Sequence, residues 1–202
     1  MSDDEAAANA AKETLKRYLV SAREALAWKL DGLSAYDRRR PLTPTGTNLL
    51  GLVKHVAYVS AGYLGDIFDR PFGEPYPWDD GDEADNLDMW VPAEESTEQI
   101  LALYRRVWEH ADATIEALDL DAPGVVPWWP EERRNVTLHQ ILVHLIAEIN
   151  RHTGHADILR EQLDASTGMN ARNSNVPEHD ADWWKRYNAR IEEAAKAIQT
   201  RE

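Results

Sequence analysis

The chain has 202 residues, of which 43% are hydrophobic and 29% charged, with a formal net charge of −14 and no cysteine. This length suits one domain with its own core. No apolar run approaches the roughly 18 residues of a membrane span, and the acidic start differs from a secretory signal. We therefore expect a cytoplasmic protein without a membrane partner. The negative charge disfavours nucleic acid as a partner. The lack of cysteine excludes disulfides, thiolate zinc sites and a cysteine nucleophile, so any thiol in the chemistry must come from another molecule.

The first half of the chain predicts two long helices. Apolar residues recur at helical spacing from about residue 5 to residue 31. After a linker that contains two prolines, Thr47 or Asn48 can cap a second helix that runs to about residue 68. A proline-rich, acidic and aromatic connection then covers residues 69–93. It is too long for a tight turn, so we expect either a lid or a surface excursion.

Two capping boxes predict two further long helices in the second half. The first box, Ser96-Thr97-Glu98-Gln99, opens a helix that ends near residue 119. The second, Thr137-Leu138-His139-Gln140, opens a helix that runs to about residue 164. Between them lies a loop with Trp128 and Trp129, which we expect to fill the core or anchor the loop, with pocket lining as the alternative.

The C-terminal part is polar and irregular over residues 166–179, and residues 182–198 predict a short helix anchored by Trp183, Trp184 and Tyr187. Four long helical patterns and no convincing alternating strand predict an all-α four-helix bundle, with a long connection between the second and third helices. We expect a single domain over residues 1–202, with a core of about 5–165 and a C-terminal extension over 166–202. An apolar seam between helices could also support a homodimer.

The most informative motif is Glu148-Ile149-Asn150-Arg151-His152-Thr153-Gly154-His155. At about 100° per residue, Glu148 and His152 fall within about 40° of Ile141, on the apolar side of the fourth helix. Both side chains should therefore point into the core, where an unpartnered carboxylate costs several kcal/mol. A bound cation would stabilise it, and the i, i+4 spacing lets two side chains reach one ion. A surface pair or a hydrogen-bonded core pair without metal is the alternative.

A metal site needs a third ligand, and His55 is the best candidate. It lies within the second helix, from which its ring could reach across the bundle axis, and Gly51 and Gly62 leave space around it. His144 and His155 lie on the same side of the fourth helix and could instead be ligands or groups that orient one. A ferritin-like di-iron site is disfavoured, because the inward Glu-x-x-His pairs that it needs are absent.

With His55 in the second helix and Glu148-x-x-x-His152-x-Gly154-His155-Ala156-Asp157-Ile158-Leu159-Arg160 in the fourth, the chain resembles the DinB-like superfamily of four-helix metalloproteins. The resemblance covers about residues 15–164 and implies a DinB-like bundle. The commoner metal triad of that superfamily has three histidines, and Glu148 here replaces one of them. The set is similar to that of mycothiol-dependent maleylpyruvate isomerase and related thiol transferases, which implies that His55, Glu148 and His152 bind a metal ion.

Two imidazoles and one carboxylate leave a fourth position of a zinc ion open, and a cation deprotonates a thiol that coordinates it. With the resemblance, this predicts a divalent-metal-dependent thiol S-transferase or isomerase that joins mycothiol, or a similar low-molecular-weight thiol, to a small-molecule electrophile. Zinc is the expected ion, and nickel, iron and manganese are alternatives.

Other side chains have weaker predicted roles. His155 is the predicted catalytic group, which would orient a ligand or carry a proton. Arg151 and Arg160 could bind a carboxylate of the thiol or the substrate, with pairing of Arg160 to Asp157 or another acidic residue of its helix as the alternative. A metal-dependent hydrolase and a non-catalytic metal-binding or ligand-binding stress-response bundle stay open as other functions.

Overall fold

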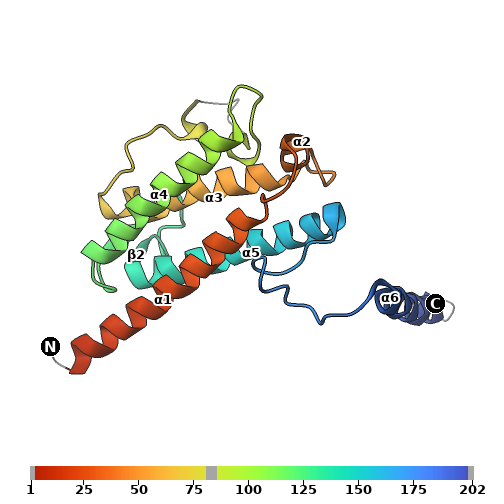
Figure 1. Ribbon diagram of the computed structural model, residues 1–202. Helices are drawn as coiled ribbons and strands as arrows, with labels where there is room; N and C mark the ends of the chain where they lie inside the picture. The colour runs from red at the N-terminus through yellow and green to blue at the C-terminus, as the bar shows by residue number, and fades with distance from the viewer. Residues whose placement is uncertain (1–2, 81–85, 200–202) are drawn as a thin grey trace.

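The computed structural model describes residues 3–80 and 86–199 and shows a helical bundle (Figure 1). Its four long helices are α1 (Asp3–Trp28), α3 (Leu49–Leu64), α4 (Thr97–Ala117) and α5 (Leu138–Asp164). Helix α1 packs along α5, and α3 packs against both α4 and α5. The predicted all-α bundle is confirmed. The predicted domain also includes residues 1–2, 81–85 and 200–202, which lie outside the described residues.

Side-chain caps fix where three of these helices begin, as the sequence predicts. The Asn48 side chain accepts a hydrogen bond from a backbone N–H in the first turn of α3. Ser96 and Gln99 form a reciprocal capping box at the start of α4. The Thr137 hydroxyl accepts from the Gln140 backbone N–H at the start of α5. Each cap satisfies an N–H that has no partner within its own helix.

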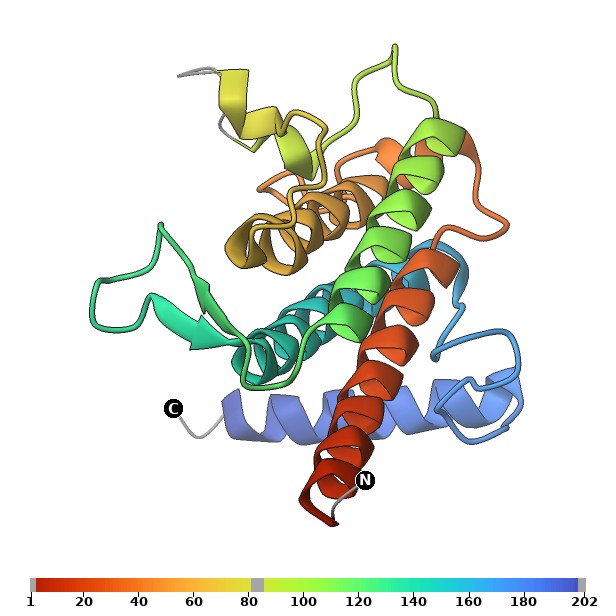
Figure 2. The same ribbon diagram turned by 90° about the vertical axis from the view of Figure 1, so that its left-hand side faces the viewer.

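The connections contain short elements that the sequence did not reveal. The linker before α3 holds α2 (Ala35–Arg39), and the connection between α3 and α4 holds the 3-10 helices η1 (Asp66–Phe68), η2 (Pro77–Asp80) and η3 (Leu87–Met89). The loop before α5 is a hairpin of β1 (Pro123–Val125) and β2 (Asn135–Thr137), which pair antiparallel (Figure 2). The expectation of no strand is therefore wrong, because three residues are too few to display alternation.

The core runs along the bundle axis and is made of aliphatic side chains from all four helices. Its fully buried members include Leu19, Leu26, Leu50, Leu52, Val53, Val107, Ile115, Leu138, Ile141, Leu142 and Leu145. Burial of this surface stabilises the bundle and holds α3 and α5 at a fixed distance, which matters because both carry candidate ligands. Among the described helices, none is long and apolar enough to cross a membrane.

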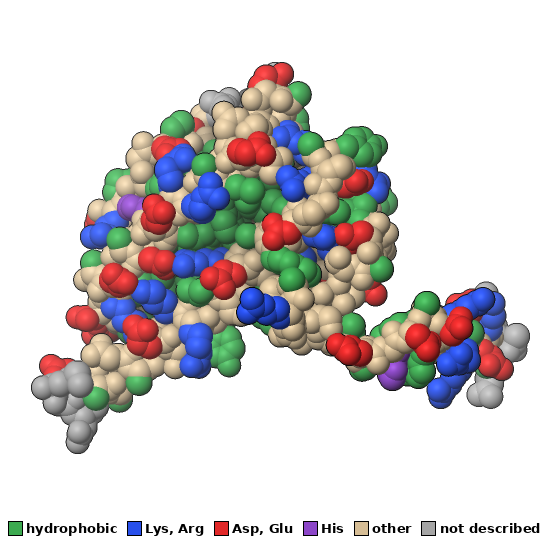
Figure 3. Space-filling view, in the orientation of Figure 1, with side chains coloured by type: hydrophobic (Ala, Val, Ile, Leu, Met, Phe, Trp, Pro, Cys, Tyr) green, Lys and Arg blue, Asp and Glu red, His purple; other side chains and the backbone are tan. Residues whose placement is uncertain are grey.

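Helix α6 (Ala181–Gln199) begins and ends within one residue of the predicted bounds and projects away from the bundle (Figures 1 and 3). The rings of Trp183, Trp184 and Tyr187 pack on one another, with ring centroids 4.8–5.7 Å apart, and Trp183 stacks on His179. The described ring contacts of these three predicted anchor residues thus lie within α6 and the segment before it. The aromatic pattern indicates that α6 has an apolar face, but such a pattern does not identify its partner.

Candidate metal centre

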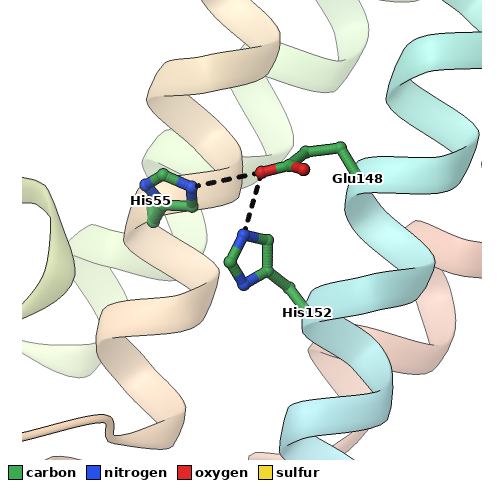
Figure 4. A group of neighbouring side chains, drawn as sticks. All are labelled: His55, Glu148 and His152. Atoms are coloured by element: carbon green, nitrogen blue, oxygen red, sulfur yellow. Dashed lines mark hydrogen bonds and ion pairs between the residues drawn. The ribbon is translucent and has the colours of Figure 1, made fainter. Parts of the chain in front are cut away.

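His55 on α3 faces Glu148 and His152 on α5 across the interior of the bundle (Figure 4). One potential ligand atom from each residue can be chosen so that all three lie within 4.8 Å of one another. Glu148 Oε1 is 3.0 Å from His152 Nε2 and 3.7 Å from His55 Nε2. The structure therefore brings together the three residues that the sequence analysis selected.

The environment favours the protonation states that a metal ion needs. Burial lowers the pKa of His152, and repulsion from His55 adds to this effect, while Glu148 opposes it. Burial by itself would raise the pKa of Glu148, but the nearby imidazoles, with His152 first, outweigh burial and lower it. At neutral pH, Glu148 is therefore ionised and the His152 imidazole is neutral. These are the forms that coordinate a metal.

Asp88, which sequence reasoning missed, completes the surroundings of His55. Its Oδ2 lies 2.5 Å from His55 Nδ1, and both side chains are less than a fifth exposed. Burial would raise the pKa of Asp88, but the hydrogen bond and the charge of His55 outweigh burial and lower it. An ionised carboxylate can only accept, so His55 Nδ1 donates a hydrogen bond and Nε2 is left facing Glu148.

Close packing of the connection on α3 places Asp88 beside His55. A Cβ at Gly51 would lie 1.8 Å from the Met89 carbonyl oxygen, so only glycine permits this approach. The Asn48 side chain also donates to the Met89 carbonyl, at 3.0 Å. Buried Lys54 pairs with Glu95 at 3.1 Å, further along the same connection. Gly51 thus makes room for the backbone that carries Asp88, rather than for the His55 ring as expected.

The alternative candidates lie outside the three-residue group. His144 contacts the rings of Tyr63 and Trp129, with centroids 4.8 and 5.1 Å away, and burial lowers its pKa. His155 is exposed, with its ring 5.5 Å from that of His152.

The two arginines that were predicted to bind a carboxylate, Arg151 and Arg160, differ in their surroundings. Arg151 is exposed on α5. Arg160 is buried and holds Asp164, with the shortest contact at 2.8 Å, as well as the Lys29 carbonyl. The alternative that Arg160 pairs with an acidic residue of its own helix is confirmed, although its guanidinium is buried and also ties α5 to α1. Asp157 pairs instead with Lys29, at 2.5 Å.

An aromatic cavity of about 530 Å³ opens next to Glu148. It is lined by Tyr58, Val59, Gly62, Tyr63, Trp78, Trp128, His144 and Glu148. Trp128 is a wall of this cavity and remains 57% exposed, so the expectation that it fills the core is wrong. Trp129 does pack against the core, as expected. The Tyr63 hydroxyl accepts hydrogen bonds from both indole N–H groups, at 3.3 and 3.0 Å, and so fixes the two rings.

The residues present fit a divalent cation. Glu148 Oε1 lies between the two Nε2 atoms, and among the described residues no other group of three such side chains converges in this way. His152 Nδ1 is buried without a hydrogen-bond partner in the described part of the chain, so this ring depends on its contacts at the centre of the group. Two imidazoles and one carboxylate form the donor set of catalytic zinc sites.

Comparison with known proteins identifies a family for this chain. A search of curated proteins gave no match. A family model described as mycothiol S-transferase matches residues 14–165, which run from within α1 to the end of α5 and include all three candidate ligands. The resemblance noted from the sequence is thereby confirmed. The chain belongs to the mycothiol S-transferase family.

Proposed function

We propose that this protein is a divalent-metal-dependent S-transferase that joins mycothiol, or a thiol similar to it, to a small electrophilic molecule. The observation that carries the proposal is the convergence of His55, Glu148 and His152 beside an open cavity, in a chain of the mycothiol S-transferase family. Zinc suits the donor set best. Isomerisation through a thiol adduct would use the same groups.

The chain's own residues supply binding and orientation. His55, Glu148 and His152 would hold the ion, which lowers the pKa of a thiol beside it when bound. Asp88 holds the His55 ring through the Nδ1 hydrogen bond, so that Nε2 faces Glu148. The aromatic walls of the cavity place apolar surface next to Glu148, and electrostatic interactions are stronger beside apolar surface than in bulk water.

The reaction is a nucleophilic substitution at carbon. The thiol sulfur attacks the carbon of the electrophile, the new carbon–sulfur bond forms as the bond to the leaving group breaks, and that group departs with the electron pair. The thiol proton must leave the site. His155, exposed to solvent beside His152, is our candidate for passing this proton to water.

The test is thiol transfer to iodoacetamide, a compact electrophile, followed as iodide release with mycothiol as the thiol. The metal-loaded protein should accelerate release over the uncatalysed rate, chelator-treated protein should not, and added zinc should restore the rate. Glu148→Gln should lose the activity together with tight zinc binding, because the amide supplies no negative charge to the ion. Glu94→Gln, at an exposed carboxylate in the connection before α4, is the matched control.

Two results would contradict the proposal. Iodide release that persists after complete removal of metal would exclude the role of the ion. Metal-dependent hydrolysis of ester or amide substrates without any thiol, at rates that mycothiol does not raise, would move the function to a hydrolase that uses water. Light scattering of the same preparation checks the predicted homodimer.

A further inference from the structure

Three glycines of α3 and its C-terminal end differ in what surrounds them. At Gly51 a Cβ would lie 1.8 Å from the Met89 carbonyl oxygen, and at Gly65 a Cβ would lie 2.4 Å from the Ala61 carbonyl oxygen. At Gly62, among the described residues outside the neighbouring helix backbone, a Cβ would meet only the far edge of the Trp128 ring within 4 Å, at 3.8 Å, which is an ordinary contact. Glycine inside a helix is less favourable than alanine. Packing therefore requires glycine at two of these positions, but not at Gly62.

The space that Gly62 leaves open belongs to the aromatic cavity. Gly62 follows His55 by seven residues, and His144 precedes Glu148 by four, so the cavity continues the same faces of α3 and α5 that carry the candidate ligands. Glu148 borders both the cavity and the metal-binding group. A molecule in the cavity would therefore lie next to the group where we propose that the thiol reacts.

We propose that this cavity binds a flat, uncharged aromatic electrophile, and that Gly62 sets the depth to which its ring enters. The proposal rests on the proposed thiol transfer for the reaction, and it adds the class of substrate. A volume of about 530 Å³ accommodates a molecule with one or two fused rings.

The walls favour an aromatic ring. Tyr58, Tyr63, Trp78 and Trp128 all line the cavity, and the two tryptophans keep 45% and 57% of their surface exposed. Both are held in place, since Trp128 donates to the Tyr63 hydroxyl and Trp78 stacks on Tyr76 with 4.9 Å between ring centroids. Large aromatic side chains that are exposed yet fixed offer apolar surface for stacking at little cost in side-chain entropy.

The charges favour an uncharged ring. The cavity is lined by no lysine or arginine among the described residues, so no basic side chain is placed to hold a carboxylate of the ligand. Arg160, the buried arginine of α5, already pairs with Asp164 and is not available. The one carboxylate in the lining, Glu148, directs an oxygen at His55 and His152, so its charge is engaged at the metal-binding group.

The test is direct binding of 2-acetylnaphthalene, measured by calorimetry on the full chain without thiol. This probe has two fused rings, no charge and no leaving group. It should bind to wild type at least tenfold more tightly than 2-naphthoate, which adds a negative charge, and more tightly than the cation trimethylphenylammonium. Gly62→Leu should weaken binding of the neutral probe at least tenfold, because the added side chain fills the cavity beside Trp128.

Matched variants separate a filled cavity from a damaged fold. Gly62→Ala should melt at or above the wild-type temperature, since a Cβ makes only an ordinary contact there and alanine favours the helix. Trp128→Ala should weaken binding of 2-acetylnaphthalene several-fold, and Trp128→Phe should restore most of it. Trp184→Ala, which removes an indole from α6, should leave binding unchanged.

Three results would overturn the proposal: no binding of 2-acetylnaphthalene to wild type, equal or tighter binding of either charged probe, or wild-type affinity in a folded Gly62→Leu variant. These results are independent of the proposed reaction, because the probe cannot react. A protein that binds the probe in a Gly62-dependent way but transfers no thiol, either to iodoacetamide or to the aromatic electrophile 1-chloro-2,4-dinitrobenzene, would keep the cavity as an aromatic site and refute the S-transferase. A protein that transfers the thiol but fails the binding test would support the S-transferase activity and refute the aromatic site.

Discussion

Removing the Asp88 carboxylate should weaken metal binding without unfolding the bundle. In Asp88→Ala, His55 loses the acceptor that fixes its Nδ1 hydrogen, so the ring is free to rotate and to exchange which nitrogen carries the hydrogen. A hydrogen bond to a charged group is worth about 1.5–3 kcal/mol. The short 2.5 Å contact and the low exposure of both side chains, 18% and 14%, place this bond within that range. The expected loss in zinc affinity is therefore roughly 10-fold to 150-fold.

The assay is competition for zinc against a chromophoric chelator at pH 7.5, with helix content followed by circular dichroism. Asp88→Asn, which keeps an acceptor oxygen but no charge, should fall between wild type and Asp88→Ala. Glu94→Ala removes a negative charge from an exposed position in the same connection and should leave the affinity unchanged. Zinc affinity within twofold of wild type in a fully helical Asp88→Ala would refute the role of Asp88.

Three further predictions concern the packing and the protonation of the bundle. Gly51→Ala should lower both the melting temperature and zinc affinity, because its Cβ would collide with the Met89 carbonyl; an unchanged affinity would show that this packing does not position the site. Asp164→Asn should cost about 1 kcal/mol of unfolding free energy at pH 7, because the carboxylate holds buried Arg160. The hydrogen bond from Arg160 lowers the pKa of Asp164. The variant and wild type should therefore differ fully in unfolding free energy above about pH 5, and this difference should vanish as acid protonates the native carboxylate. A difference that is constant with pH, measured by denaturant unfolding, would contradict this. Because burial lowers the pKa of His152, the protein should still take up zinc at a pH below about 6.5. If zinc binding is already half lost at a pH well above that value, this prediction is wrong.

The helices and the ligand group could be predicted from the sequence because both depend on local spacing. Helical periodicity and side-chain caps locate the long helices, and the i, i+4 spacing puts Glu148 and His152 on one face of α5. Selecting His55 required one further inference, namely that a histidine within an apolar helix faces the other ligands across the bundle axis. That step succeeded because bundle helices present their buried faces to one another.

The remaining parts of the site depend on packing between distant segments. Asp88 is one of several acidic residues in a polar connection, and only the close approach of Met89 to Gly51 distinguishes it. The one available signal was the general need of a metal-binding histidine for an acceptor at its other nitrogen. Trp128 could not be assigned to a cavity wall, because an aromatic residue in a loop can equally be buried or exposed.

The central claim is that His55, Glu148 and His152 hold a divalent metal ion on which thiol transfer depends. Elemental analysis of protein purified without chelator or nickel resin, wild type beside His55→Ala, tests it most directly. The account predicts close to one equivalent of metal in wild type and its loss in the variant, with helix content preserved in both. A folded wild-type protein that contains no metal and takes up no zinc at neutral pH would contradict it.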